Sequence, residues 1–90
     1  MEKITLLDQV VLNSRLVPAE NHRKVVAYLA VVVLQLRFVD LCEYFGRNEN
    51  EVRNVVTRYA VKMNKNTAFS NILFELTRRF YTSNLIKQIV

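Results

Sequence analysis

The chain has 90 residues, which allows one domain with a single modest core and excludes a catalytic domain joined to an accessory one. It is 51% hydrophobic with one Gly and one Pro, a composition that favours long helices and disfavours the turn-rich pattern of a β-sandwich or barrel. The formal net charge of +5 favours a polyanionic partner, although a basic surface kept only for solubility is an alternative.

Positive charge is concentrated in the second half of the chain. Residues 1–45 contain five Lys and Arg and five Asp and Glu, whereas residues 46–90 contain eight Lys and Arg and three Glu. A basic half of this kind is typical of a protein that binds nucleic acid. All of the excess positive charge therefore lies within residues 46–90.

The sequence has no feature of a secreted or membrane protein. Cys42 is its one cysteine, so no internal disulfide can form, and no signal-peptide cleavage pattern follows Met1. The longest apolar run, Val25–Leu34, has ten residues, about half of what a bilayer-spanning helix requires. We expect a cytoplasmic protein that is associated with the nucleoid if it binds DNA.

The first two predicted helices cover residues 3–12 and 19–35. In the first, Ile4, Leu7 and Val11 recur at helical spacing. The centre of the second is rich in β-branched residues and fits a buried strand by propensity alone, but its length without Gly or Pro favours a helix. Because this segment is apolar nearly all round, we expect it to be the central helix on which the others pack.

A short third helix is predicted over residues 39–45. Its expected buried contacts are Leu41, Tyr44 and Phe45. Gly46 should end this helix, because only glycine adopts the left-handed conformation of such a stop without steric strain.

A fourth helix begins soon after that stop and is expected to run to about Asn64. Asn48 is its predicted N-cap, and Glu51 is placed to complete a capping box. At helical spacing its inward face contains Val52, Val55, Val56, Tyr59 and Met63. Its outward face contains Asn50, Asn54, Thr57 and Val61, with Arg53 and Arg58 on the flanks.

The last predicted helix begins at an N-cap, Thr67, after a polar break at residues 64–67. Its inner stripe contains Phe69, Ile72, Leu73, Leu76 and Phe80. A second break is predicted at residues 82–84, before the apolar tail "LIKQIV" of residues 85–90. We expect that tail either to cover the core or to meet a partner.

Residues 38–64 have the order of a helix-turn-helix motif, in which a short helix and a Gly-containing turn precede a longer helix. Cys42 is a small residue at the point where the two helices must approach closely. In such motifs the second helix lies in the major groove of DNA, although helix pairs of this form also occur as plain packing units. The sequence therefore predicts a single all-α domain over residues 1–90, a compact bundle of about five helices that contains a helix-turn-helix.

Three segments resemble a known family. They are "RKVVAYLA", "VDLCEYFGRNENEVRNVVTRY" and "LFELTRRF", and together they span about residues 21–81. This stretch resembles the C-terminal DNA-binding domain (domain IV) of the bacterial replication initiator DnaA, a Trp-repressor-like helix-turn-helix domain. The resemblance implies double-stranded DNA binding in replication or transcription regulation, with a basic loop ahead of the central helix touching the minor groove.

The chain departs from the family at the residues that contact the initiator's DNA box. After "FGR" the family continues Asp-His-Ser/Thr-Thr-Val, whereas this chain has Asn-Glu-Asn-Glu-Val at residues 48–52. The family's glycine, arginine and valine are matched by Gly46, Arg47 and Val52. In the segment that corresponds to the family's basic loop, only Arg23 matches. Two carboxylates at a helix N-terminus offset the positive end of the helix dipole. We therefore expect the chain to read a sequence other than the initiator's box.

The predicted DNA contacts divide by chemistry. Asn pairs with adenine, Arg with guanine, and Thr with a base or a methyl group. The predicted base contacts are Asn50, Arg53, Asn54 and Thr57. The predicted phosphate contacts are Arg23, Arg47, Arg58, Lys62 and Lys65. Glu49 and Glu51 either cap the helix or accept from cytosine.

Two other classes of function are alternatives to DNA binding. One is a helical protein-interaction module that keeps the fold but has lost specific DNA contact. Such a module is expected to dimerise or to bind a protein through the apolar tail. We expect no enzyme, cofactor, metal ion or small-molecule substrate, because no catalytic or metal-spaced cluster is present. His22 lacks a second ligand nearby in sequence, and Cys42 lies in an apolar context.

Overall fold

The computed structural model describes the backbone of residues 2–89 and the side chains of residues 3–83. Its elements are α1 (Glu2–Ser14), a short 3-10 helix η1 (Ala19–Asn21), α2 (His22–Val32), α3 (Phe38–Phe45), α4 (Glu49–Lys65) and α5 (Thr67–Ile89). No strand occurs within residues 2–89. The predicted fold class, a small all-α bundle, is confirmed.

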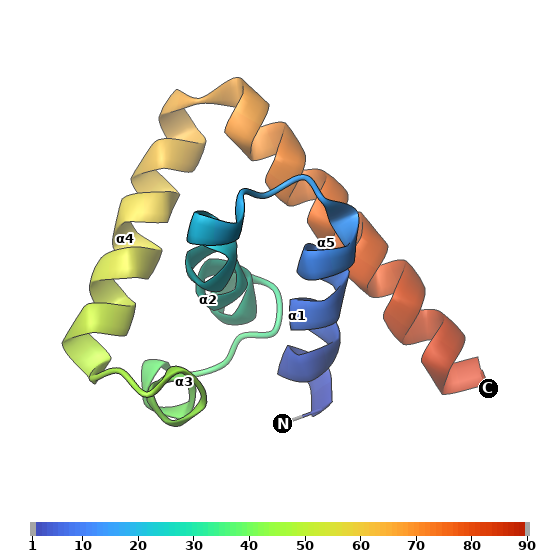
Figure 1. Ribbon diagram of the computed structural model, residues 1–90, viewed down its shortest axis with the longest axis horizontal. Coiled ribbons are helices and arrows are strands. Elements are labelled where there is room, and N and C mark those ends of the chain that lie inside the picture. The colour runs from blue at the N-terminus through green and yellow to red at the C-terminus, as the bar shows by residue number, and fades with distance from the viewer. Residues whose placement is uncertain (1, 90) are drawn as a thin grey trace.

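Helix α2 lies at the centre of the bundle, between α4 on one side and α1 on the other (Figure 1). Every side chain from Val25 to Ala30 is buried, as the nearly all-round apolar pattern predicts. Helices α4 and α5 form two long arms that meet near residue 66, and α1 packs against both α2 and α5. Helix α3 lies beside the N-terminal end of α4.

Each outer helix contributes one apolar stripe to the common core. These stripes contribute Ile4, Leu7 and Val11 from α1, Leu41 from α3, Val52, Val56 and Tyr59 from α4, and Leu73, Leu76 and Phe80 from α5. Of the residues expected in the core, Val55, Met63, Phe69 and Ile72 are only half-buried. The radius of gyration is 12.6 Å, close to the value of about 12 Å expected for a folded chain of this length.

The central helix is shorter than the predicted span of residues 19–35. Its first turn is the 3-10 helix η1, and α2 itself ends at Val32. Gln35 takes a positive φ of 57°, which reverses the chain, and the Leu36 backbone N–H donates to the Ala30 carbonyl at 3.1 Å. Helix α3 then begins at Phe38, where Asp40 accepts from the Arg37 backbone N–H at 3.2 Å. Local capping therefore overrides the continuous apolar pattern.

The connection between α3 and α4 has the predicted boundaries. Gly46 adopts φ 65° and ψ 33°, and its N–H donates to the Cys42 carbonyl at 2.9 Å. Asn48 caps α4, because its Oδ1 accepts from the Glu51 backbone N–H at 2.9 Å. The Glu51 carboxylate is bound by the Asn48 side-chain amide at 2.8 Å, so the return contact of the cap is made between side chains.

Tyr44 was expected in the core, and this prediction is wrong. Its side chain is on the surface, with 38% exposed, because its hydroxyl donates to Asp8 Oδ2 of α1 at 2.9 Å. Leu41 alone is fully buried among the side chains of α3, and Phe45 is half-buried. Tyr44 therefore ties α3 to α1 through a polar contact at the rim.

The start and the interruption of the last helix also differ from the prediction. Asn66, not Thr67, caps α5, since its Oδ1 accepts from the Phe69 backbone N–H at 3.0 Å. No break occurs at residues 82–84, because the Thr82 hydroxyl donates back to the Arg78 carbonyl at 3.0 Å and the segment contains neither Gly nor Pro. The side chains of the apolar tail, residues 85–90, lie outside the described residues.

Candidate nucleic-acid interface

The outward face of α4 presents a row of polar side chains. Asn50, Asn54 and Thr57 are exposed, and none of their side chains is hydrogen-bonded to any residue that the structure describes. Val61 continues the row and is 48% exposed. The predicted division of α4 into an inward and an outward face is therefore confirmed, and the polar groups of this face are free to bind a ligand.

Arg53, the fourth predicted base contact, lies on the α3 side of this face. Its guanidinium donates to Glu49 Oε1 at 2.8 Å and lies 5.2 Å from the centre of the Phe38 ring. The pair is about half exposed, so its attraction is screened and amounts to about 1 kcal/mol or less. Arg53 can therefore exchange Glu49 for another partner at little energetic expense.

Arg47 is also paired. It donates to Glu51 Oε2 at 3.5 Å, which places a carboxylate beside the first turn of α4. With Glu49 in the same turn, two negative charges offset the positive end of the helix dipole. The N-terminal end of α4 is therefore unlike an anion-binding helix N-terminus, which presents unopposed backbone N–H groups.

The other predicted phosphate contacts differ in their surroundings. Arg23, Arg58 and Lys65 are exposed and form no ion pair with any side chain of residues 3–83. Lys62 lies over two aromatic rings, 4.6 Å from the Phe69 centroid and 5.7 Å from that of Tyr59. Of the five cations, three are therefore free, one is paired with a carboxylate and one is stacked on the core.

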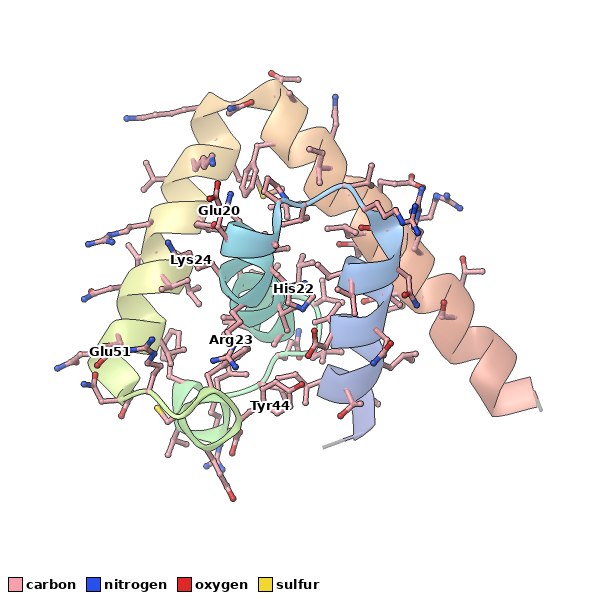
Figure 2. All side chains as sticks on the ribbon, viewed as in Figure 1. Glu20, His22, Arg23, Lys24, Tyr44 and Glu51 are labelled. Carbon is pink, nitrogen blue, oxygen red and sulfur yellow. The ribbon has the colours of Figure 1, made fainter. Side chains whose placement is uncertain are left out.

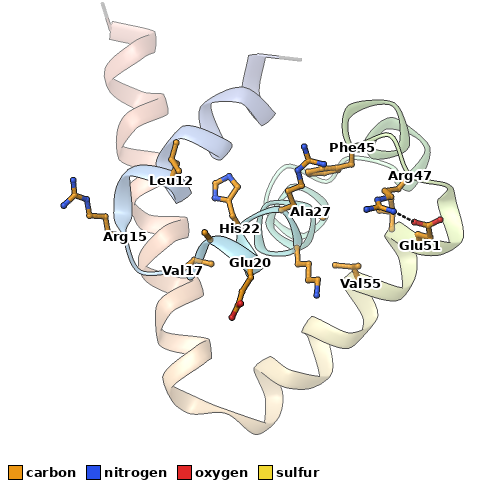
Figure 3. Close-up of a pocket in the computed structure, with 14 residues that line it drawn as sticks. Leu12, Arg15, Val17, Glu20, His22, Ala27, Phe45, Arg47, Glu51 and Val55 are labelled. Atoms are coloured by element: carbon orange, nitrogen blue, oxygen red, sulfur yellow. Dashed lines mark hydrogen bonds and ion pairs between the residues drawn. The ribbon is translucent and has the colours of Figure 1, made fainter.

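A cavity of about 870 Å³ separates the N-terminal end of α2 from the start of α4 (Figure 3). Helix α2 contributes Arg23 and Lys24 to its lining, and the α3–α4 segment contributes Phe45, Arg47 and Val55. In Figure 2, Lys24 lies between α2 and α4, and Arg23 lies between α2 and α3. The cavity thus brings Arg23 and Arg47, which are distant in sequence, to the same surface.

A polar cluster that the sequence did not reveal fixes the position of α2. Asp8 of α1 binds His22 Nε2 through one carboxylate oxygen and accepts from the Tyr44 hydroxyl through the other. Burial raises the pKa of the Tyr44 hydroxyl, and the hydrogen bond to Asp8 raises it further. Because these residues are 14 and 36 positions from Asp8, no local spacing signal connects them. The contact with Asp8 holds His22 in place beside the cavity.

Two arginines of α5 share one carboxylate partner. Glu75 accepts hydrogen bonds from both Arg78 and Arg79, the latter at 3.0 Å. These bonds lower the pKa of the Glu75 carboxyl to about 2. Glu75, Arg78 and Arg79 therefore form a three-residue ion network, whereas Arg23 of α2 and Arg58 and Lys65 of α4 have no ion-pair partner among the side chains of residues 3–83.

Comparison with protein-family models, curated proteins and solved structures found no match for the chain. Among the described residues, no group of three or more His, Cys, Asp and Glu side chains is arranged to hold a metal ion. None of the helices, as far as the structure describes them, combines the length and the apolar character that crossing a bilayer requires.

Proposed function

We propose that this chain is a non-enzymatic protein that binds double-stranded DNA, with α3 and α4 acting as a helix-turn-helix and α4 entering the major groove. The observation that carries the proposal is the row of Asn50, Asn54 and Thr57, three polar side chains with no described partner on one exposed helix face. Neither the core nor the caps of α4 require them. The resemblance to the DnaA domain supports the same function.

The dimensions of α4 suit this role. Its 17 residues give a length of about 25 Å, and B-DNA's major groove, about 12 Å wide, admits such a helix. Asn50 to Thr57 rise by about 10 Å, the height of about three base pairs. Asn50 and Asn54 can pair with adenine, Thr57 with a thymine methyl group, and Arg53 with guanine after it leaves Glu49.

The free cations set the expected strength of the phosphate contacts. Arg23, Arg58 and Lys65 have no ion-pair partner among the described side chains, which predicts a slope of log affinity against log salt of about −2.7. Recruitment of Arg47 and Lys62 would steepen the slope to about −4.5. A slope between these values is the expected result of a titration with duplex DNA.

Fluorescence anisotropy with labelled duplexes at several salt concentrations tests the proposal, and selection from a random duplex pool identifies the preferred site. Arg53→Ala should relax the preference at one base position, whereas Lys65→Ala should weaken binding to all sequences alike. Absence of binding at low salt would refute the proposal. A binder whose salt slope is close to zero would refute the assignment of the phosphate contacts.

A second candidate function is protein interaction through α5. Phe74 is 61% exposed and Tyr81 is 55% exposed, and their spacing of seven residues places them on one side of the helix. Large exposed aromatic side chains of this kind are common at protein interfaces. If α5 mediates self-association, the mass from light scattering should rise with concentration and fall to that of a monomer in Phe74→Ser/Tyr81→Ser.

A further inference from the structure

The cavity beside α2 combines an apolar wall with a polar rim. Leu12 and Val17 line one side, and Ala27, Phe45 and Val55 line the other (Figure 3). A volume of about 870 Å³ falls within the range of about 300–1,000 Å³ found for small-molecule sites. An apolar wall with few convergent polar groups is also typical of such sites. The cavity therefore has the size and the lining to hold a compact organic molecule.

Two cations on α2 favour a negative charge at the rim. Arg23 and Lys24 line the cavity, and neither forms an ion pair or hydrogen bond with any other side chain between residues 3 and 83. Figure 2 shows both on the side of α2 that faces α3 and α4. Arg47, on the opposite wall, is held by Glu51 at 3.5 Å, and Arg15 points away from the cavity in Figure 3.

The negative groups at the cavity are fewer. Glu51 is paired with Arg47, and Asp8, which binds His22, is not part of the lining. Glu20 is the one lining carboxylate without an ion-pair partner among the described side chains. Because Arg23 and Lys24 are unpaired and Glu20 is the one unpaired carboxylate, the rim of the cavity has a net positive charge.

We propose that this cavity is a binding site for a small organic anion with an apolar body. The anionic group pairs with Arg23 and Lys24, and the apolar body lies against Phe45 and Val55. Pairing at the exposed rim gives selectivity for charge, and burial of the apolar body gives most of the affinity.

Occupation of the cavity would also affect DNA binding. Arg23 lines the cavity and pairs with the anion, and it is also one of the proposed phosphate contacts, so an anion bound there competes with DNA for Arg23. This competition rests on the proposed function, whereas binding of the anion does not. The two are therefore measured separately.

The first experiment titrates the full chain, without DNA, with three probes that share one ring system: 2-naphthoate, 2-naphthol and 2-naphthylmethylammonium. Calorimetry should give naphthoate an affinity about tenfold above that of naphthol, with the ammonium weakest, because two partly exposed charges each contribute up to about fivefold. In NMR spectra the largest shifts should occur at amides around the cavity, such as those of Ala27, Phe45 and Val55.

Matched variants test the rim charges. Arg23→Gln/Lys24→Gln should weaken naphthoate about tenfold and leave naphthol unchanged, and Glu20→Gln should strengthen naphthoate by up to about fivefold. Lys3→Gln removes a charge from α1 outside the cavity and should leave naphthoate binding unchanged. Equal affinities for the three probes, or shifts that map away from the cavity, would overturn the proposal.

The second experiment adds DNA. Saturating naphthoate should lower the affinity for duplex DNA, while naphthol at the same concentration should not. If naphthoate binds in the cavity and leaves DNA affinity unchanged, competition between the anion and DNA is refuted, whereas the proposed anion site is supported. If the chain fails to bind DNA at all, the proposed function is refuted, and the result of the first experiment still decides the site.

Discussion

Replacing Glu49 by Gln is expected to weaken the fold. Glu49 accepts from Arg53 at 2.8 Å, and the two side chains are 52% and 51% exposed. At this exposure the pair stabilises the fold by about 0.2–1 kcal/mol, and an acidic residue in the first turn adds about 0.3–1 kcal/mol through the helix dipole. The substitution should therefore lower the free energy of unfolding by about 0.5–2 kcal/mol, measured by urea denaturation.

The same substitution is expected to strengthen DNA binding. It removes a negative charge from the end of α4 that we place in the major groove, and it frees Arg53. A new contact by Arg53 at an exposed site should raise affinity about threefold to fivefold. If that contact is to a phosphate, the salt slope should become more negative by about 0.9. Stability and affinity thus change in opposite directions.

Anisotropy titrations of the wild type and Glu49→Gln measure this effect, with Glu75→Gln as the control. The control variant removes the same charge from α5, outside the proposed interface, and frees two arginines there. If Glu75→Gln raises DNA affinity as much as Glu49→Gln does, the gain comes from the change in net charge alone and not from the release of Arg53. Weaker binding by a folded Glu49→Gln would make Glu49 a direct contact, one that accepts from cytosine, and would refute our assignment of the face.

Three further predictions concern the fold. Gly46→Ala should lower the free energy of unfolding by about 1–2 kcal/mol in urea melts, because the φ of Gly46 is +65°, a conformation that strains any residue with a Cβ. An added Cβ meets no atom within 4 Å, so this backbone strain is the whole effect, and a loss near zero would contradict it. The pKa of Glu75 is lowered to about 2 from 4.5, so its stabilising contribution is complete above pH 4.5 and is lost as pH falls toward 2; Glu75→Gln should flatten the stability profile in that window. Leu41→Ala should lower the free energy of unfolding by about 2–5 kcal/mol, because Leu41 is fully buried. The control change Val39→Ala, at an exposed position of the same helix, should have a much smaller effect. Equal losses in the two variants would show that α3 does not pack through Leu41.

Local patterns predicted most of the fold. The inward and outward faces of α4 follow from residue spacing alone, and Gly46 and Asn48 mark its boundary because each satisfies a backbone requirement at that position. The break expected at residues 82–84 did not form, because its polar residues tolerate a helix when the Thr82 hydroxyl bonds to a carbonyl one turn earlier. Polar composition without Gly or Pro is thus a weak signal for a helix end.

The candidate site was only partly accessible to sequence reasoning. The pairing of Arg53 with Glu49 has the four-residue spacing of helical ion pairs, so this contact was open to prediction from the sequence. The contacts of Asp8 with His22 and Tyr44 depend on how three helices meet, and no periodicity encodes them. The cavity is likewise formed by segments that are distant in sequence.

The packing of α1 against the core determines which fragment of the chain can keep this fold. The segment that resembles the DnaA domain begins at about residue 21, yet Ile4, Leu7 and Val11 of α1 are fully buried in the common core. A fragment that starts at residue 21 would uncover the apolar sides of α2 and α5, and it would release α3 from its link to Asp8. The smallest fragment that retains α4 in its present orientation must therefore include α1, although α1 supplies none of the proposed DNA contacts.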